Sequence, residues 1–131
     1  MFTQIRTSKE NKEIVTQLTR TLGLGAENVI ARIALTYSLS KDHKLDLKNI
    51  GNSSGKEYSK SVLFGEYSDY YMGLICIHYD LYKTDKDLSK YIKMHIDDGL
   101  QLLNEEINQR SNIDGFDFLV EKIENGLLEL V

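Results

Sequence analysis

Apolar residues recur at helical spacing through most of the chain, which predicts a mainly α-helical domain. The expected helices are residues 8–22 with a Ser8 cap, about 26–40, a largely buried 70–81, a longest helix from Thr84 or Asp85, and a last amphipathic helix after Gly115. The core stripe expected on the longest helix comprises Leu88, Tyr91, Ile92, His95, Ile96, Leu100, Leu103 and Ile107. The apolar face expected on the last helix comprises Phe118, Leu119, Ile123 and Leu127.

The segments around the first expected helix suggest a unit of strand, helix, turn and helix. Residues 2–8 alternate in a way that permits a short strand, and the polar, glycine-dotted segment 41–61 predicts a loop or extended chain. Strand, helix, turn and helix follow one another as in ribbon-helix-helix DNA-binding modules, where Gln4 and Arg6 would reach the major groove. A plain helical hairpin fits the pattern equally well.

Two glycine-containing segments require a choice between nucleotide binding and turn formation. Gly23 and Gly25 supply a G-x-G, but Asn28 replaces the third glycine and the preceding residues are helical, unlike a dinucleotide fingerprint. The run GNSSGKE has one residue too few between its glycines for a P-loop. A turn is therefore expected, with Gly23 in the left-handed conformation past the helix end. We expect Gly23, Gly25 and the part-buried Arg32 at a subunit interface.

Composition narrows the class of protein. At 131 residues and 15.0 kDa the chain is expected to form one domain. One cysteine favours a reducing cytoplasm, and the sequence shows no apolar run long enough for a membrane span. Residues 1–65 contain ten Lys and Arg against six Asp and Glu, whereas residues 66–131 contain six against fourteen. The first half is thus a candidate basic face.

Catalytic candidates are few. The three histidines have no metal-ligand spacing with each other or with Cys76, which favours packing over catalysis for this apolar-flanked thiol. The acidic pairs 97–98 and 105–106 are expected on the solvent side of the longest helix. Tyr67, Tyr70 and Tyr71 suit either core packing or stacking on bases. We expect no enzyme activity, no metal and no cofactor.

The basic residues of the first half are the strongest functional signal. Side chains of this kind, partly on a flexible loop, suit contacts to DNA phosphates, which position a duplex without reading its sequence. The candidates are Arg6, Lys9, Lys12, Arg20, Lys41, Lys44, Lys48, Lys56 and Lys60. A merely solvated loop is the alternative.

Two runs in the first part of the chain resemble the DndE family of bacterial DNA phosphorothioation systems. They are RTSKENKEIVTQLTRTLGLGAENVIARIALTYSLS and GKEYSKSVLFGEYSDYYMGLI. The resemblance implies an accessory subunit that acts beside a cysteine desulfurase, an iron–sulfur protein and an ATPase, machinery that replaces a non-bridging phosphate oxygen of DNA with sulfur. It also implies binding to duplex DNA, nicked DNA included, by a homo-oligomer such as a tetramer.

These observations together predict a non-catalytic, cytoplasmic DNA-binding subunit of a sulfur-modification complex. One alternative is an adaptor that binds partner proteins without contacting DNA. The other is an enzyme that uses Cys76 as a sulfur carrier.

Overall fold

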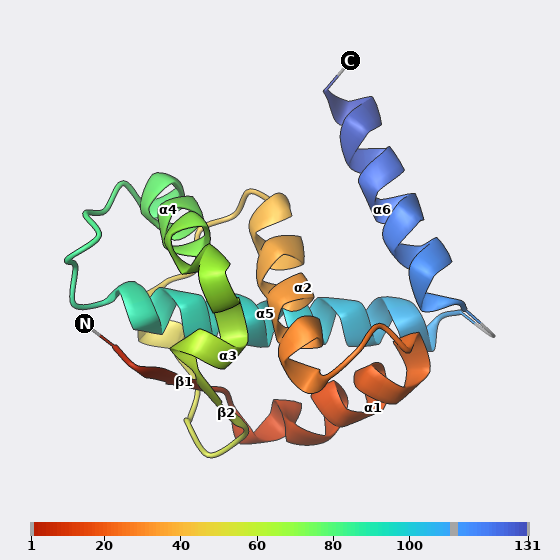
Figure 1. Ribbon diagram of the computed structural model, residues 1–131, viewed down its shortest axis with the longest axis horizontal. Coiled ribbons are helices and arrows are strands. Elements are labelled where there is room, and N and C mark those ends of the chain that lie inside the picture. The colour runs from red at the N-terminus through yellow and green to blue at the C-terminus, as the bar shows by residue number, and fades with distance from the viewer. Residues whose placement is uncertain (1, 111–112, 131) are drawn as a thin grey trace.

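Two crossing helices organise the molecule (Figure 1). In the computed structural model, which describes residues 2–110 and 113–130, α2 (Glu27–Ser40) packs across the middle of α5 (Leu88–Asn108). A Cβ atom on Gly99 of α5 would lie 1.8 Å from the Ala34 carbonyl oxygen. Glycine is therefore required for the two backbones to approach this closely. The interface buries most of the expected core stripe of α5, which is confirmed.

Shorter helices surround this crossing. They are α1 (Lys12–Leu22), α3 (Lys60–Phe64), α4 (Ser68–Tyr79) and α6 (Gly115–Glu129), with single turns η1 (Lys9–Asn11), η2 (Leu47–Asn49) and η3 (Gly65–Tyr67). The mainly α-helical prediction is confirmed. Two predicted starts were early: α5 begins at Leu88, and α1 begins after η1 because the Ser8 hydroxyl caps nothing and bonds elsewhere.

The two short strands that pair with each other belong to the same chain. Strand β1 (Gln4–Arg6) pairs antiparallel with β2 (Glu57–Ser59), so the short strand that the sequence permitted exists and residues 41–61 are in part extended. Buried Ile5 faces buried Tyr58 across the pair. The order strand, helix, turn, helix is thus present, but the partner strand comes from the same chain rather than from a second subunit as in a ribbon-helix-helix dimer.

The turn between α1 and α2 follows the prediction. Gly23 adopts φ +62° at the end of α1, and Gly25 has φ +130°. Both conformations strain any residue with a side chain, although a Cβ on Gly23 would meet no atom within 4 Å. Gly23 is therefore favoured by its backbone conformation and not by a close packing contact, unlike Gly99.

Two helices are less buried than expected. In α4 the side chains of Met72 and Ile75 are buried, but that of Ile77 is 83% exposed, so this helix is not largely buried. Helix α6 projects from the body (Figure 1), with Phe118 buried near its start but Leu127 57% exposed. No helix among the described residues is both long and apolar enough to cross a bilayer.

Candidate nucleic-acid interface

Three of the predicted basic residues line one surface groove beside α1. Lys12 and Arg20 lie eight residues apart on the same helix, which places them on one face about 12 Å apart along the axis. Lys56 joins them from the segment before β2, and the groove encloses about 460 Å³. Backbone hydrogen bonds from Thr7 N–H to the Lys56 carbonyl and from Gly55 N–H to the Thr7 carbonyl, both 2.9 Å, hold that segment in place.

Charge within this α1 groove is mainly positive. Lys12 and Arg20 are exposed, and Glu13 is the one carboxylate among the lining residues. Lys56 is partly neutralised, because its Nζ lies 3.3 Å from Oε1 of Glu27. The hydroxyl of Thr16 donates to the other Glu27 oxygen over 2.7 Å, which holds the carboxylate at the edge of the groove. Such a surface can accept several phosphates of a nucleic-acid backbone.

Two further candidates lie just before α1. Arg6 on β1 is exposed, and its Nε donates to Glu57 Oε1 over 2.9 Å. Lys9 is exposed one turn before Lys12, and its backbone N–H donates to Oδ1 of Asn52. Arg6 and Lys9 thus lie on β1 and η1, the elements that precede α1, and do not line the α1 groove.

The other four predicted residues lie elsewhere. Lys41 sits over the Tyr37 ring at 4.6 Å and lines a groove between α2 and α6. Lys44 and Lys48 are exposed on the segment after α2. Lys60 lines a different pocket, beside Phe2. A single protomer therefore divides the nine residues among several surfaces.

A buried ion pair that the sequence analysis missed supports the start of α1. Lys93 is only 5% exposed, and its Nζ donates to Asp97 Oδ2 over 2.6 Å and to Ser8 Oγ over 2.9 Å. The Asn11 amide donates to the other Asp97 oxygen over 2.7 Å. The spacing of Lys93 and Asp97 is a helical i,i+4 signal, but no sequence pattern pairs either residue with Ser8.

A second buried network contains His95, which is 0% exposed. The Tyr79 hydroxyl lies 2.6 Å from its Nε2 and the Ser38 hydroxyl 2.8 Å from its Nδ1, while Ser38 donates to Asp98 over 2.6 Å. Burial, helped by the charge of His78, lowers the His95 pKa to about 4. The ring is thus neutral at pH 7 and both its nitrogens are engaged.

Both networks correct one prediction. Asp97 and Asp98 lie within hydrogen-bonded, half-buried clusters rather than on a solvent face, and Glu106 is also half-buried, whereas Glu105 is exposed. Their positions on α5 turn these carboxylates toward neighbouring segments that are distant in sequence, which helical spacing alone did not reveal.

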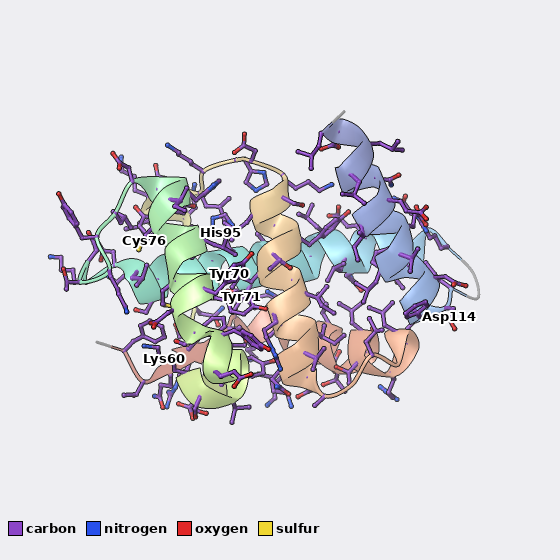
Figure 2. All side chains as sticks on the ribbon, turned by 45° about the horizontal axis from the view of Figure 1, so that its top comes forward. Lys60, Tyr70, Tyr71, Cys76, His95 and Asp114 are labelled. Atoms are coloured by element: carbon purple, nitrogen blue, oxygen red, sulfur yellow. The ribbon has the colours of Figure 1, made fainter. Side chains whose placement is uncertain are left out.

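The remaining candidates divide between packing and exposure (Figure 2). Cys76 is half-buried and packs against the core. Tyr71 stacks on Phe64 with ring centroids 4.9 Å apart, whereas Tyr70 is exposed. Arg32 is half-buried as predicted, and its Nε has no hydrogen-bond partner among the described residues.

A family model described as "DNA sulphur modification protein DndE" matches residues 4–111, which end before α6 begins. The fold is similar to that of DndE from Escherichia coli B7A, whose crystal structure is described as involved in DNA phosphorothioation modification. The TM-score is 0.63 at 19% identity, with 79% of this chain and 98% of that chain covered.

The fold is also similar to the crystal structure of a glycine-to-lysine double mutant of DndE, with a TM-score of 0.65, 19% identity and the same coverage. A comparison with curated protein sequences found no match. At such identity the solved structures establish the shared fold, and the family model covers most of the chain. The chain therefore belongs to the DndE family of DNA sulfur-modification (phosphorothioation) proteins.

Proposed function

We propose that this chain is a non-catalytic subunit of a DNA phosphorothioation complex and binds duplex DNA as a homo-oligomer, such as a tetramer. The α1 groove, with Lys12, Arg20 and Lys56 on its walls, carries this proposal. Cationic side chains along a groove release counterions from the phosphate backbone and so bind a duplex with little regard to base sequence. The acidic second half of the chain then faces away from DNA or toward partner proteins.

Two features support a role without catalysis. His95 is enclosed, burial lowers its pKa so that the ring is neutral, and both ring nitrogens are hydrogen-bonded, so it is unavailable as a general base. Cys76 packs against the core, which suits a structural thiol. A Cys76→Ser variant should retain phosphorothioation in cells, whereas a sulfur-carrier role requires its loss.

The test of DNA binding is a salt series with intact and nicked duplexes, comparing wild type with a Lys12→Gln/Arg20→Gln variant. Removing two phosphate contacts should lower affinity about tenfold at moderate salt and reduce the log–log salt slope by about 2. The matched control is Lys86→Gln/Lys90→Gln, which removes two exposed charges away from the α1 groove. Equal losses in both variants, or no wild-type binding at low salt, would contradict the proposal.

We also propose that the Gly23–Gly25 turn and Arg32 contribute to the contact between protomers. The turn is exposed, and the unpaired, buried Nε of Arg32 would gain a partner there. Gly23→Asn is the informative variant, because asparagine tolerates the left-handed conformation better than bulkier residues. We expect a smaller solution mass with an unchanged far-ultraviolet circular dichroism spectrum. An unchanged mass would rule this contact out.

A protein-binding adaptor is the second candidate, and α6 favours it. This helix follows the family match and exposes apolar side chains, among them Ile123, Leu127 and Leu128. Co-purification with the desulfurase, the iron–sulfur protein and the ATPase, with and without residues 115–131, tests this role. An α6-dependent complex that forms without DNA, together with no duplex binding, would replace the DNA-binding proposal with the adaptor.

A further inference from the structure

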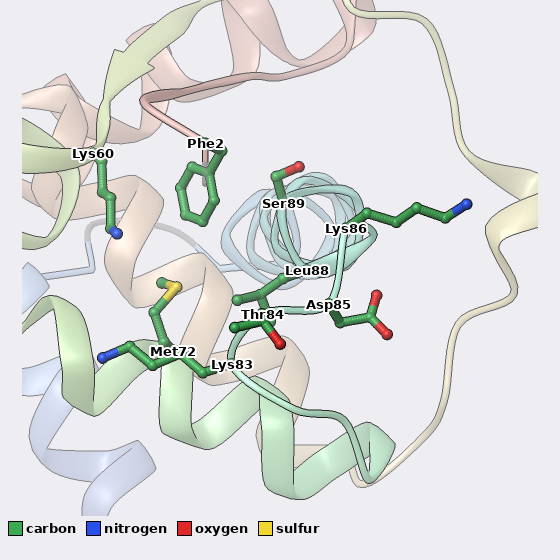
Figure 3. Close-up of a pocket in the computed structure, with 9 residues that line it drawn as sticks. All are labelled: Phe2, Lys60, Met72, Lys83, Thr84, Asp85, Lys86, Leu88 and Ser89. Carbon is green, nitrogen blue, oxygen red and sulfur yellow. The ribbon is translucent and has the colours of Figure 1, made fainter.

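A second pocket lies on a different part of the molecule from the α1 groove. It encloses about 440 Å³ between the chain start, the beginnings of α3 and α5, and the segment that joins α4 to α5 (Figure 3). The lining residues are Phe2, Lys60, Met72, Lys83, Thr84, Asp85, Lys86, Leu88 and Ser89. No residue of this pocket lines the α1 groove.

The base of the pocket is apolar and includes an aromatic ring. Met72 and Leu88 belong to the buried core, and the half-buried ring of Phe2 lies at the pocket (Figure 3). An apolar, ring-bearing surface of this kind binds a flat organic group by stacking and by exclusion of water. Hydroxyls of Thr84 and Ser89 add hydrogen-bonding groups at the wall.

Two lysines bring positive charge to the same pocket. Lys60 Nζ lies 5.0 Å from the centre of the Phe2 ring, and Lys83 Nζ lies 2.8 Å from Asp69 Oδ1. The hydrogen bond and charge of Lys83, with a contribution from the charge of Lys60, lower the pKa of the exposed Asp69 carboxyl. The Asp69 carboxylate thus already interacts with both lysines, and the anionic group of a ligand can interact with them in the same way.

Lys86 is a natural comparison for these two side chains. It also borders the pocket, but its side chain points away from the cavity (Figure 3). It has the same formal charge as Lys83, and both side chains are exposed. Substituting Lys86 therefore separates a local contact from a general change in net charge.

We propose that this pocket binds a nucleotide, with the base packed against Phe2 and Met72 and the phosphate at Lys60 and Lys83. The volume falls within the usual range for small-molecule sites, and an aromatic surface beside two ammonium groups matches a planar base joined to a phosphate. The nucleotide is either free or the 5′-phosphorylated end of a nucleic-acid strand. This site does not depend on duplex binding at the α1 groove.

Calorimetric titration of the full chain with AMP tests the pocket, and adenosine supplies the comparison without phosphate. Saturable AMP binding is expected. Adenosine should bind at least about tenfold more weakly because it loses the contacts to both lysines, and Lys83→Gln should bind AMP about fivefold to tenfold more weakly because it loses one of them. Lys86→Gln should change the affinity less than about twofold. Absence of saturable binding, or an equal loss in Lys86→Gln and Lys83→Gln, would overturn the proposal.

Short single-stranded oligonucleotides with and without a 5′-phosphate then distinguish the two sources. Tighter binding of the phosphorylated strand than of AMP, lost in Lys83→Gln, supports a strand end as the ligand. AMP binding without any effect of the 5′-phosphate supports a free nucleotide. The Lys12→Gln/Arg20→Gln variant should bind AMP as wild type does, so failure of the α1 groove and failure of this pocket give different results.

Discussion

Helices α5 and α6 have similar sequence patterns but different surroundings. Both place apolar residues at helical spacing, yet α5 lies in the centre of the molecule and buries residues from Leu88 to Ile107 along its length. Helix α6 is attached through its first half, where Phe118 is buried and Gly115 contacts the end of α1 at Leu22. Farther along α6, Ile123 and Leu127 are exposed.

Ion pairs add to the attachment of α6. Arg110, after α5, donates to both carboxylate oxygens of Glu121 over 2.7 Å, and Lys122 pairs with Glu106, which also accepts a hydrogen bond from Tyr37 over 2.6 Å. Partly exposed ion pairs contribute little to stability compared with a buried helix crossing. The comparison shows that an amphipathic pattern identifies the apolar face of a helix but not what covers it.

Gly99→Ala should have the largest effect, because it acts on the crossing itself. The new methyl group would lie 1.8 Å from the Ala34 carbonyl oxygen, so α2 and α5 must separate. We expect a loss of at least about 3 kcal/mol in the free energy of unfolding, despite the better helix propensity of alanine. Urea denaturation measures this loss. A Gly99→Ala protein as stable as wild type would show that the two backbones do not approach this closely.

Leucine truncation compares the two helices directly. Leu100 on α5 is 0% exposed, so Leu100→Ala should cost about 2–5 kcal/mol through lost burial and a cavity. Leu127→Ala on α6 removes an exposed side chain and should change the unfolding free energy by less than about 0.5 kcal/mol. A loss of unfolding free energy in Leu127→Ala that depends on protein concentration would reveal that a second copy covers α6. The apolar face of α6 would then not be exposed in solution.

The dependence on pH should also differ between the two regions. Burial lowers the pKa of His95 to about 4 from 6.5, so the unfolded chain takes up this proton first as the pH falls. The body of the protein should keep its full stability above pH 6.5 and lose about 1–3 kcal/mol between pH 6.5 and 4.

Urea denaturation across that pH window checks this prediction, with His95→Gln as the variant that should flatten the curve. Although burial opposes it, hydrogen bonds from Lys122 and Tyr37 lower the pKa of Glu106, so the α6 attachment should weaken only below about pH 4.5. Glu106→Gln is thus the matched control, with an unaltered profile above that pH. A wild-type free energy of unfolding that stays constant from pH 6.5 to 4 would contradict the lowered pKa of His95.

Local pattern accounts for much of the fold. Helical periodicity predicted α2 and the buried stripe of α5. The left-handed conformation of Gly23 was also predicted, because local backbone geometry decides the end of a helix. The pairing of Ile5 with Tyr58 joins residues far apart in sequence, and strands of three residues each carry too little pattern to show which segments pair. Gly99 was missed for a similar reason, since only the position of α2 makes a glycine necessary there.

The candidate site was predictable only where it lies on one helix. Lys12 and Arg20 share a face by their spacing, whereas Lys56 reaches the same groove through the backbone pairing of its segment with Thr7. Asp97 was assigned to solvent because its partners Ser8 and Asn11 belong to the other end of the chain. Charge counts predicted a basic half, but not how its residues divide among surfaces.

Gly126→Ala should have little effect on the global free energy of unfolding and should act in the opposite direction to Gly99→Ala. A Cβ on Gly126 of α6 would meet no atom within 4 Å, so alanine brings only its better helix propensity, worth about 0.5–1 kcal/mol in a helix interior. Because α6 is free at this end, the gain should appear as slower amide hydrogen exchange in the last turns of α6, with little change in global unfolding. Faster exchange after the substitution would instead mean that another surface packs against Gly126 in solution. In that case both α5 and α6 would be covered in solution, and the two helices would differ only in the surface that covers them.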